Sequence, residues 1–330
     1  MSAAASIGLV GCGRLTQAGY LPALGAARGV HLAAVADTDL VRRDAVAAEG
    51  ARLAGTGVAA FCTLHELLEG TAVDAVVLAT PAAAHLADAK IAAAARVPTL
   101  VEKPPAQDVA GAAALAALDP APWIAFNRRF GAGQRAVRSA LVGEEGKDVG
   151  SGGARAAQRV DFLLELRYRR SSWGAHTVGD EALLDLGPHL VDLARWLSGG
   201  EVTGIRSATL SYERAQLELE LERGRATLRC AADRPHRELV EARGEGDEPL
   251  AHHSEGGLMA GLRGRVTARG EPHPLVASLT AQLEAFAGAA RGERAPTLAT
   301  AADGHAVMAV IDAARACAAG GRPVELTVAA

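Results

Sequence analysis

Short apolar runs alternate with helix-like segments before residue 126. Helices are expected near Arg14–Arg28 and over Ala82–Ala95, and a capping box from Thr63 to Glu66 opens a short helix. Continuous apolar strands separated by helices are typical of a parallel sheet that is covered on both faces. The strands expected in this sheet are Ile7–Val10, Leu32–Ala36, Ala75–Ala79, Thr99–Glu102 and Trp123–Phe126.

The later part of the chain has a different pattern. From Gln216 to Glu222 apolar and polar residues alternate with period two, which favours an antiparallel sheet with one solvated face. The strands expected here are Val160–Tyr168, Ile205–Tyr212, Ala215–Leu221, Ala226–Cys230 and Glu238–Arg243. Helices are expected at Leu183–Leu197, Ala277–Ala290 and Ala301–Ala318.

These patterns predict two domains, which suits a length of 330 residues. Residues 1–126 are predicted to form an α/β Rossmann domain that binds a dinucleotide. Residues 127–330 are predicted to form an α+β domain with an open, mostly antiparallel sheet, for substrate binding and oligomerisation. The late helices can pack back on the first domain.

Composition narrows the function classes. The net charge is −4 with both signs mixed along the chain, so we expect neither nucleic acid nor an anionic membrane as a partner. The chain has no long apolar stretch that is free of charge, so we expect no membrane span. The first ten residues are typical of a strand and not of a signal peptide. Four scattered cysteines indicate reduced thiols in a cytoplasmic protein, and the sequence predicts no metal site.

A glycine turn follows the first expected strand. Gly11 and Gly13 allow a tight turn and a close approach of a pyrophosphate to the following helix, although Thr16 stands where a third glycine or alanine is usual. Asp37, 21 residues after Thr16, can accept both ribose hydroxyls and favours NAD over NADP. The cofactor-binding residues expected here are Gly11, Cys12, Gly13, Arg14, Leu15 and Asp37. The alternative is a Rossmann-like turn that binds nothing.

Two further segments carry candidate chemistry. Lys103, one of three lysines among 34 basic residues, comes directly after an expected parallel strand, at the sheet edge where such folds bind ligands. Asp185 and His189 are four residues apart, so a helix would place them on one face. Because proline is tolerated in the first turn of a helix, Pro188 predicts that this helix begins near residues 185–187.

The sequence resembles the family of glucose–fructose oxidoreductase, inositol dehydrogenase and the MocA proteins. Ala82 replaces the family's usual asparagine, and Val178–Glu181 replaces a segment that is often glycine-rich. The matching segments, in order, are Gly11-Cys-Gly-Arg14 with Pro22, Thr80-Pro81 with His85, Glu102-Lys103-Pro104, Asn127-Arg-Arg-Phe130, Leu184-Asp185-Leu-Gly-Pro-His189-Leu-Val-Asp192, and a C-terminal Ala302-Asp-Gly304 helix ending in Gly320-Gly-Arg322.

The resemblance implies an NAD(P)-dependent dehydrogenase or reductase that acts on a sugar, cyclitol or nucleotide-linked sugar. It assigns His189 as the general acid/base, Lys103 as the group that polarises the substrate oxygen, and Asp185 as the residue that holds the substrate and tunes His189. It places Thr80, Pro81, His85, Glu102 and Lys103 at the cofactor. Asn127, Arg128, Trp173 and His176 are expected near the substrate; alternatively Asn127 and Arg128 tie the domains and the other two pack in a loop.

Two other functions remain open at this point. One is an enzyme that retains NAD and cleaves a glycoside or isomerises a sugar without net redox change. The other is a non-catalytic NAD-binding regulator, although such proteins usually lose the catalytic lysine or histidine. In this family the open sheet face pairs subunits, so a homodimer or homotetramer is expected.

Overall fold

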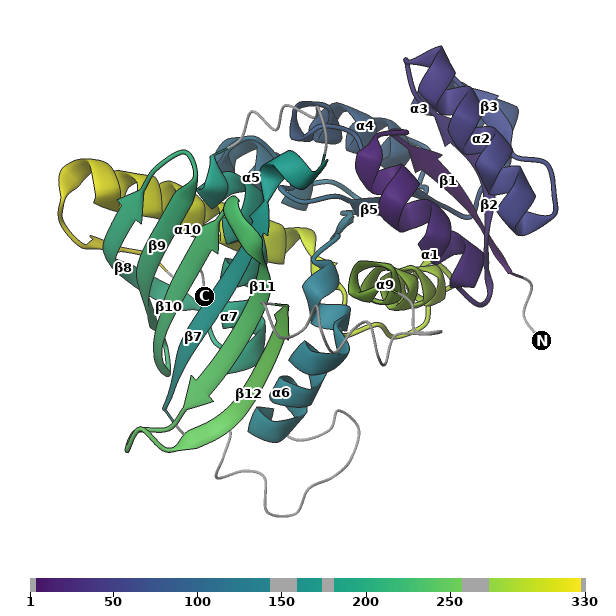
Figure 1. Cartoon of the computed structure of the whole chain (residues 1–330). Coiled ribbons are helices and arrows are strands. Elements are labelled where there is room, and N and C mark those ends of the chain that lie inside the picture. The colour runs from purple at the N-terminus through teal and green to yellow at the C-terminus, as the bar shows by residue number, and fades with distance from the viewer. Residues whose placement is uncertain (1–3, 143–158, 174–180, 257–272, 328–330) are drawn as a thin grey trace. The chain divides into compact units, whose positions relative to one another are not determined.

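The computed structural model describes residues 4–142, 159–173, 181–256 and 273–327. The chain divides into two compact units (Figure 1). The first comprises Met1–Phe130 and Pro272–Met308, and the second comprises Gly131–Glu271 and Ala309–Ala330. Within the described residues, no helix is long and apolar enough to cross a membrane.

The first unit contains a seven-stranded sheet in the order β13-β6-β5-β4-β1-β2-β3. All neighbours are parallel except β13 and β6. All four residues of β4 have no solvent exposure, so the continuous apolar pattern correctly predicted a sheet covered on both faces. The strands are β1 (Ala5–Val10), β2 (Val30–Ala36), β3 (Ala59–Phe61), β4 (Ala75–Leu78), β5 (Thr99–Val101), β6 (Trp123–Ile124) and β13 (Ala299–Thr300).

The helices of this unit differ from expectation at the first helix and at α2 (Leu40–Ala54) and α5 (Val109–Ala116), which were not expected. The helix expected over 14–28 is a π-helical turn, η1 (Thr16–Tyr20), that continues directly into α1 (Leu21–Ala26). The capping box is confirmed, because the Thr63 side chain accepts a hydrogen bond from the Glu66 amide at 3.2 Å. The other helical elements are α3 (Leu64–Gly70), α4 (Ala82–Ala94), η2 (Asn127–Phe130), α9 (Pro274–Ala290) and α10 (Ala301–Gly320).

The second unit is built on a sheet in the order β12-β11-β7-β10-β9-β8-β14. Only the β7–β10 pair is parallel, so the prediction of an open, mostly antiparallel sheet is confirmed. The strands are β7 (Val160–Arg169), β8 (Val202–Leu210), β9 (Arg214–Leu221), β10 (Gly224–Ala231), β11 (Asp233–Arg243), β12 (Pro249–Gly256) and β14 (Val324–Glu325), and the helices are α6 (Ala132–Val142), η4 (Arg170–Trp173), α7 (Ala182–Ser198) and the end of α10.

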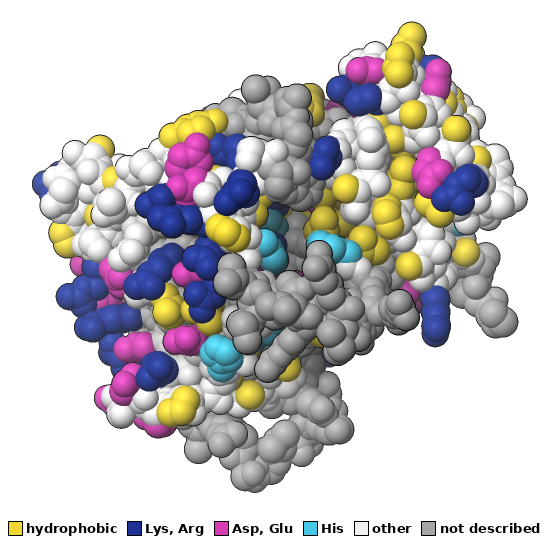
Figure 2. Space-filling model, viewed as in Figure 1, with side chains coloured by type: hydrophobic (Ala, Val, Ile, Leu, Met, Phe, Trp, Pro, Cys, Tyr) yellow, Lys and Arg dark blue, Asp and Glu magenta, His cyan; other side chains and the backbone are white. Residues whose placement is uncertain are grey.

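The two faces of this second sheet are unlike. α7 packs on β7, β9 and β10, where alternate residues such as Leu217 and Leu219 are buried. The opposite face carries arginines and acids, which gather over the strands in Figure 2. On it Glu220 pairs with Arg206 at 2.7 Å and with Arg225 at 3.5 Å. The period-two pattern therefore separates a packed face from a charged one.

α7 begins earlier than Pro188 predicted. It runs from Ala182 to Ser198, which places Pro188 inside the helix instead of in its first turn. Apart from Leu184, residues 182–197 are all buried. A proline in a helix interior costs a backbone hydrogen bond, on the order of 3 kcal/mol. We infer that the packing of this buried helix on the sheet compensates for that loss.

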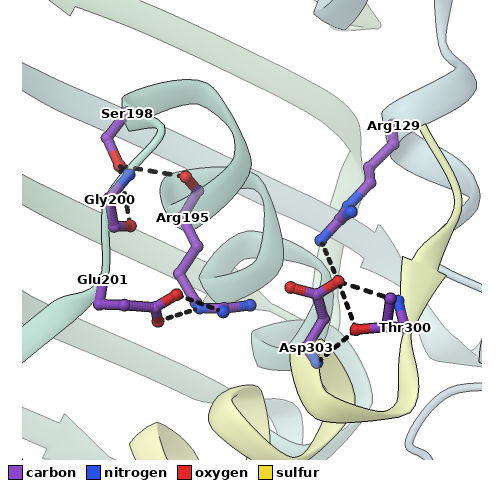
Figure 3. A network of polar contacts seen from close by, with 7 residues as sticks. All are labelled: Arg129, Arg195, Ser198, Gly200, Glu201, Thr300 and Asp303. Atoms are coloured by element: carbon purple, nitrogen blue, oxygen red, sulfur yellow. Dashed lines mark hydrogen bonds and ion pairs between the residues drawn. The ribbon is translucent and has the colours of Figure 1, made fainter. Parts of the chain in front are cut away.

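The boundary between the units differs from the one expected at residue 126, because the first unit continues to Phe130 and takes up a later segment of the chain. The Asn127 side chain donates a hydrogen bond to Ser278 Oγ of α9 at 3.0 Å, within the first unit. Arg129 pairs with Asp303 at 3.6 Å, and Asp303 caps α10 by exchanging hydrogen bonds with Thr300 (Figure 3). Because β13 pairs with β6 and α9 packs on α1, residues 127–130 and 272–308 belong with the first unit.

Candidate active site

The glycine turn after β1 lies at the sheet edge where β1 and β4 are neighbours. Gly11 has φ +95°, and a Cβ there would lie 2.6 Å from the Ala79 carbonyl, so only glycine fits. A Cβ at Gly13 would meet no atom within 4 Å. Because the strand order reverses between β1 and β4, this edge is the switch point at which doubly wound sheets bind ligands.

Thr16 explains the departure from the usual third glycine. Its side chain is buried, and its hydroxyl donates a hydrogen bond to the Gly11 carbonyl at 2.5 Å. The same helical segment packs closely on α9 through Gly19, where a Cβ would lie 2.8 Å from the Leu279 side chain. Threonine therefore closes the turn with its side chain, and the helix packs closely through another glycine.

The Asp37 carboxylate is held by hydrogen bonds from the glycine turn and from its own loop. Its Oδ2 accepts the Cys12 amide at 2.7 Å, and its Oδ1 accepts the Asp39 amide at 2.8 Å. Arg42 approaches the same carboxylate at 3.4 Å. The Cys12 thiol is fully buried, and burial together with the Asp37 charge raises the pKa of Cys12 to about 12, so the thiol stays protonated. The carboxylate is therefore anchored beside the turn.

The loops after β4 and β5 carry the next motifs. β4 and β5 are adjacent and parallel, so Thr80 and Lys103 follow the ends of neighbouring strands. His85 of α4 links the two loops, because its Nε2 lies 2.8 Å from the Thr80 carbonyl and its Nδ1 lies 3.1 Å from the Pro105 carbonyl. The ring is 1% exposed, and burial lowers its pKa. The structure thus ties His85 to both loops, and its contact with the cofactor stays a prediction.

Glu102 is held by a residue that the sequence analysis did not single out. The Tyr20 hydroxyl donates a hydrogen bond to Glu102 Oε1 at 2.6 Å, and the Lys103 amide donates one to Oε2 at 2.9 Å. Both Tyr20 and Glu102 are buried. Burial raises the pKa of Glu102, while the hydrogen bonds and the Lys103 charge lower it.

In the second unit, Asp185 and His189 lie one turn apart on α7, and both are buried. The Tyr168 hydroxyl, at the end of β7, donates a hydrogen bond to Asp185 Oδ2 at 2.5 Å. Arg170 approaches the same oxygen at 3.7 Å, and its guanidinium stacks over the Tyr212 ring at 4.8 Å. Burial and the Asp185 charge raise the pKa of Tyr168, so its phenol remains a donor.

The small number of tyrosines is a sequence signal that could have pointed to Tyr20 and Tyr168 as partners of the site residues. The chain has three tyrosines, and each contacts a predicted site residue or its neighbour. Among the other predicted residues, Asn127 contacts Ser278, and Arg128 is partly buried. Trp173 ends η4, and His176 lies outside the described residues. Their expected substrate contacts therefore stay predictions.

Residues 5–119 match the profile of an oxidoreductase family with an NAD-binding Rossmann fold. Residues 154–234 match the profile of the GFO/IDH/MocA C-terminal domain. The chain belongs to the Gfo/Idh/MocA family. The predictions of the family, of a Rossmann domain followed by a sheet domain, and of NAD as the cofactor are confirmed.

Two curated relatives illustrate the family. The rhizopine catabolism protein MocA of Rhizobium meliloti is 31% identical over 208 residues, which are 62% of this chain and 60% of that protein. An inositol 2-dehydrogenase of Leifsonia xyli subsp. xyli is 30% identical over 185 residues, which are 54% of this chain and 48% of that protein. The matched region thus spans less than two thirds of either relative.

Solved structures match nearly the whole chain. GenD2 from gentamicin A biosynthesis, in complex with NAD, has a TM-score of 0.76 at 23% identity and covers 99% of this chain and 98% of its own. The myo-inositol dehydrogenase of Lactobacillus casei, in complex with NAD(H) and myo-inositol, has a TM-score of 0.73 at 18% identity and covers 99% and 98%. At these identities the likeness shows the shared fold.

Proposed function

We propose that this protein transfers hydride between a hydroxyl or carbonyl carbon of a sugar, cyclitol or nucleotide-linked sugar and nicotinamide. The observation that carries the proposal is the edge of the first sheet, where the glycine turn, the Thr80 loop and Lys103 follow neighbouring parallel strands. The family match and the relatives named as inositol dehydrogenases support an alcohol substrate.

The proposed chemistry assigns one task to each of three side chains. The Lys103 ammonium polarises the substrate oxygen, and the His189 imidazole exchanges the hydroxyl proton, a role that histidine commonly has in enzymes. The Asp185 carboxylate, which Tyr168 and Arg170 hold, binds a substrate hydroxyl and tunes His189. Bound NAD supplies the hydride acceptor.

Turnover measurements test these assignments. Purified protein is mixed with NAD and a panel of inositols and hexoses, and NADH formation is followed by absorbance. On a substrate that turns over, Lys103→Met and His189→Ala should each lower kcat about 10²- to 10⁴-fold. The matched control is Lys90→Met, an exposed lysine of α4, which should keep full turnover. Full activity of both site variants would refute the assigned roles.

The same assay separates the alternatives. Cofactor that stays bound through purification, with product formed and no net NADH, would favour a glycosidase or isomerase. NAD binding without turnover on any substrate of the panel would favour a regulator. Both outcomes would replace the dehydrogenase proposal.

We also propose that the charged face of the second sheet joins two copies of the chain into a homodimer or homotetramer in the cytoplasm. Arginines and acids alternate on this face, with Glu165 close to Arg167 at 3.3 Å and Arg237 at 3.8 Å, so two copies related by a twofold axis can exchange ion pairs. Four free cysteines support a reducing compartment. A monomer by light scattering would refute the assembly.

A further inference from the structure

A chain of hydrogen bonds in the first unit joins the helix that follows the glycine turn to the backbone of Lys103. Tyr20, the last residue of η1, donates its phenol to one oxygen of Glu102 at 2.6 Å. The other oxygen accepts the Lys103 amide at 2.9 Å. Tyr20 is fully buried and Glu102 is 6% exposed, so water competes little for these bonds.

The π-helical turn determines where this phenol points. The Leu21 amide donates to the Thr16 carbonyl, five residues earlier, which widens the turn by one residue relative to an α-helix. The same Thr16 closes the glycine turn through its hydroxyl. A regular helix would rotate the residue at position 20 by about 100° from its present direction. The local irregularity is therefore what aims Tyr20 at the β5 loop.

We propose that Tyr20 is a positioning residue for hydride transfer: it holds the Glu102 carboxylate, and Glu102 holds the main chain from which Lys103 extends. This inference rests on the proposed function for the role of Lys103. The ionisable groups that act on Glu102 are Tyr20 from η1 and Lys103 from the same loop. Through these hydrogen bonds, the helical turn beside the expected pyrophosphate site also holds the backbone of Lys103 in place.

Lysine is rare enough to make a direct test possible. The chain has three lysines, so ¹⁵N-lysine labelling gives three backbone amide signals, and the Lys103 signal is identified by its loss in Lys103→Arg. Because this amide donates to Glu102, its chemical shift should report protonation of the carboxyl group. Glu102→Gln should abolish the titration of the signal, which assigns it to Glu102.

Tyr20→Phe removes one oxygen and keeps the packing of the ring. The Tyr20 hydrogen bond lowers the pKa of Glu102, so its loss should raise the midpoint of the Lys103 signal by about one pH unit. The matched control, Tyr168→Phe, removes a phenol from the second unit and should leave that midpoint unchanged. An unchanged midpoint in Tyr20→Phe, with a folded protein, overturns the proposal whether or not a substrate is known.

Kinetics then separate this inference from the proposed function. If the proposal holds, Tyr20→Phe lowers kcat about tenfold, with less effect on the KM for NAD, and moves the acidic limb of the kcat profile to higher pH. A purely structural role would lower the thermal midpoint without moving that limb. If the midpoint of the Lys103 signal moves but Lys103→Met keeps full turnover, the proposed function fails and the role of Tyr20 in catalysis fails with it.

Discussion

The carboxylates of Glu102 and Asp185 each accept a hydrogen bond from a tyrosine, yet their electrostatic surroundings differ. Glu102 lies in the first unit with a phenol and a backbone amide as donors, and its burial raises its pKa. Asp185 lies in the second unit with a phenol and the Arg170 guanidinium at 3.7 Å. The hydrogen bonds to the first carboxyl group thus come from neutral donors, with the Lys103 charge acting on its pKa, whereas the second has a guanidinium directly beside it.

This difference suits different tasks. A carboxylate with an arginine partner can accept hydrogen bonds from a polyol substrate. A buried carboxyl group whose hydrogen bonds come from neutral donors is stabilised less in its charged form. Its main role is to connect two segments of the chain. Stability measurements can test whether the two sites differ in this way.

The largest effect is expected at the second unit. Asp185→Ala should lower the free energy of unfolding by about 3 kcal/mol, because the Arg170 side chain, which is only 12% exposed, would lose this carboxylate. Glu102→Gln should cost less than about 1 kcal/mol, because the amide oxygen can still accept a hydrogen bond. Denaturant titrations of both variants check the contrast, and equal losses would contradict it.

The pH dependence of stability should distinguish the two sites next. The pKa of Glu102 is raised above its ordinary value of 4.5, so the folded state binds the proton more tightly than the unfolded state does. The resulting stabilisation is complete below pH 4.5 and is lost as the pH rises through the higher pKa of the folded state. Glu102→Gln should therefore gain stability relative to the parent as the pH rises above 4.5, because the amide does not titrate. A constant difference between pH 4 and 8 would contradict the assignment.

Tyr168→Phe should have a smaller effect than Asp185→Ala. Loss of one hydrogen bond to a charged acceptor should reduce the free energy of unfolding by about 1 to 2 kcal/mol, since Arg170 still compensates the Asp185 charge. Thermal unfolding of Tyr168→Phe beside Tyr212→Phe, which keeps the ring under Arg170, provides the measurement and its control. A loss as large as that of Asp185→Ala would show that the phenol, and not the arginine, dominates at this site.

The smallest effect is expected at an exposed pair on the charged sheet face. Arg206 is half exposed and pairs with Glu220, so Arg206→Gln should change the stability of one subunit by less than about 0.5 kcal/mol. Thermal unfolding at several protein concentrations is the appropriate measurement. A larger loss that grows on dilution would locate Arg206 in the proposed subunit interface.

Residues predicted correctly are those whose signal is local. The four apolar residues of β4 define a buried parallel strand without knowledge of their neighbours. The position of Asp37 directly after β2 is confirmed in the same way, while its contact with the cofactor stays a prediction. By contrast, Tyr20 and Glu102 are 82 positions apart, and no local pattern pairs them. Their contact depends on the π-helical turn, which is a tertiary outcome that periodicity does not encode.

Two segments show why other predictions failed. α2 was not expected, because exposed apolar residues such as Leu40 and Val41 blur its helical stripe. The beginning of α7 was misplaced because a local rule about Pro188 was applied to a helix that packs on a sheet along most of its length. For α7, burial against the sheet decided the structure, and single-sequence patterns report such burial only indirectly.

The discontinuous first unit has a consequence for biosynthesis. Its edge strand β13 and its helix α9 come after all strands of the second sheet except β14, and α10 passes from one unit to the other between Met308 and Ala309. A ribosome therefore releases nearly all of the second sheet before it has finished the Rossmann core. During synthesis, the surface of the N-terminal half on which α9 packs stays uncovered until residues 272–308 emerge and complete the first unit.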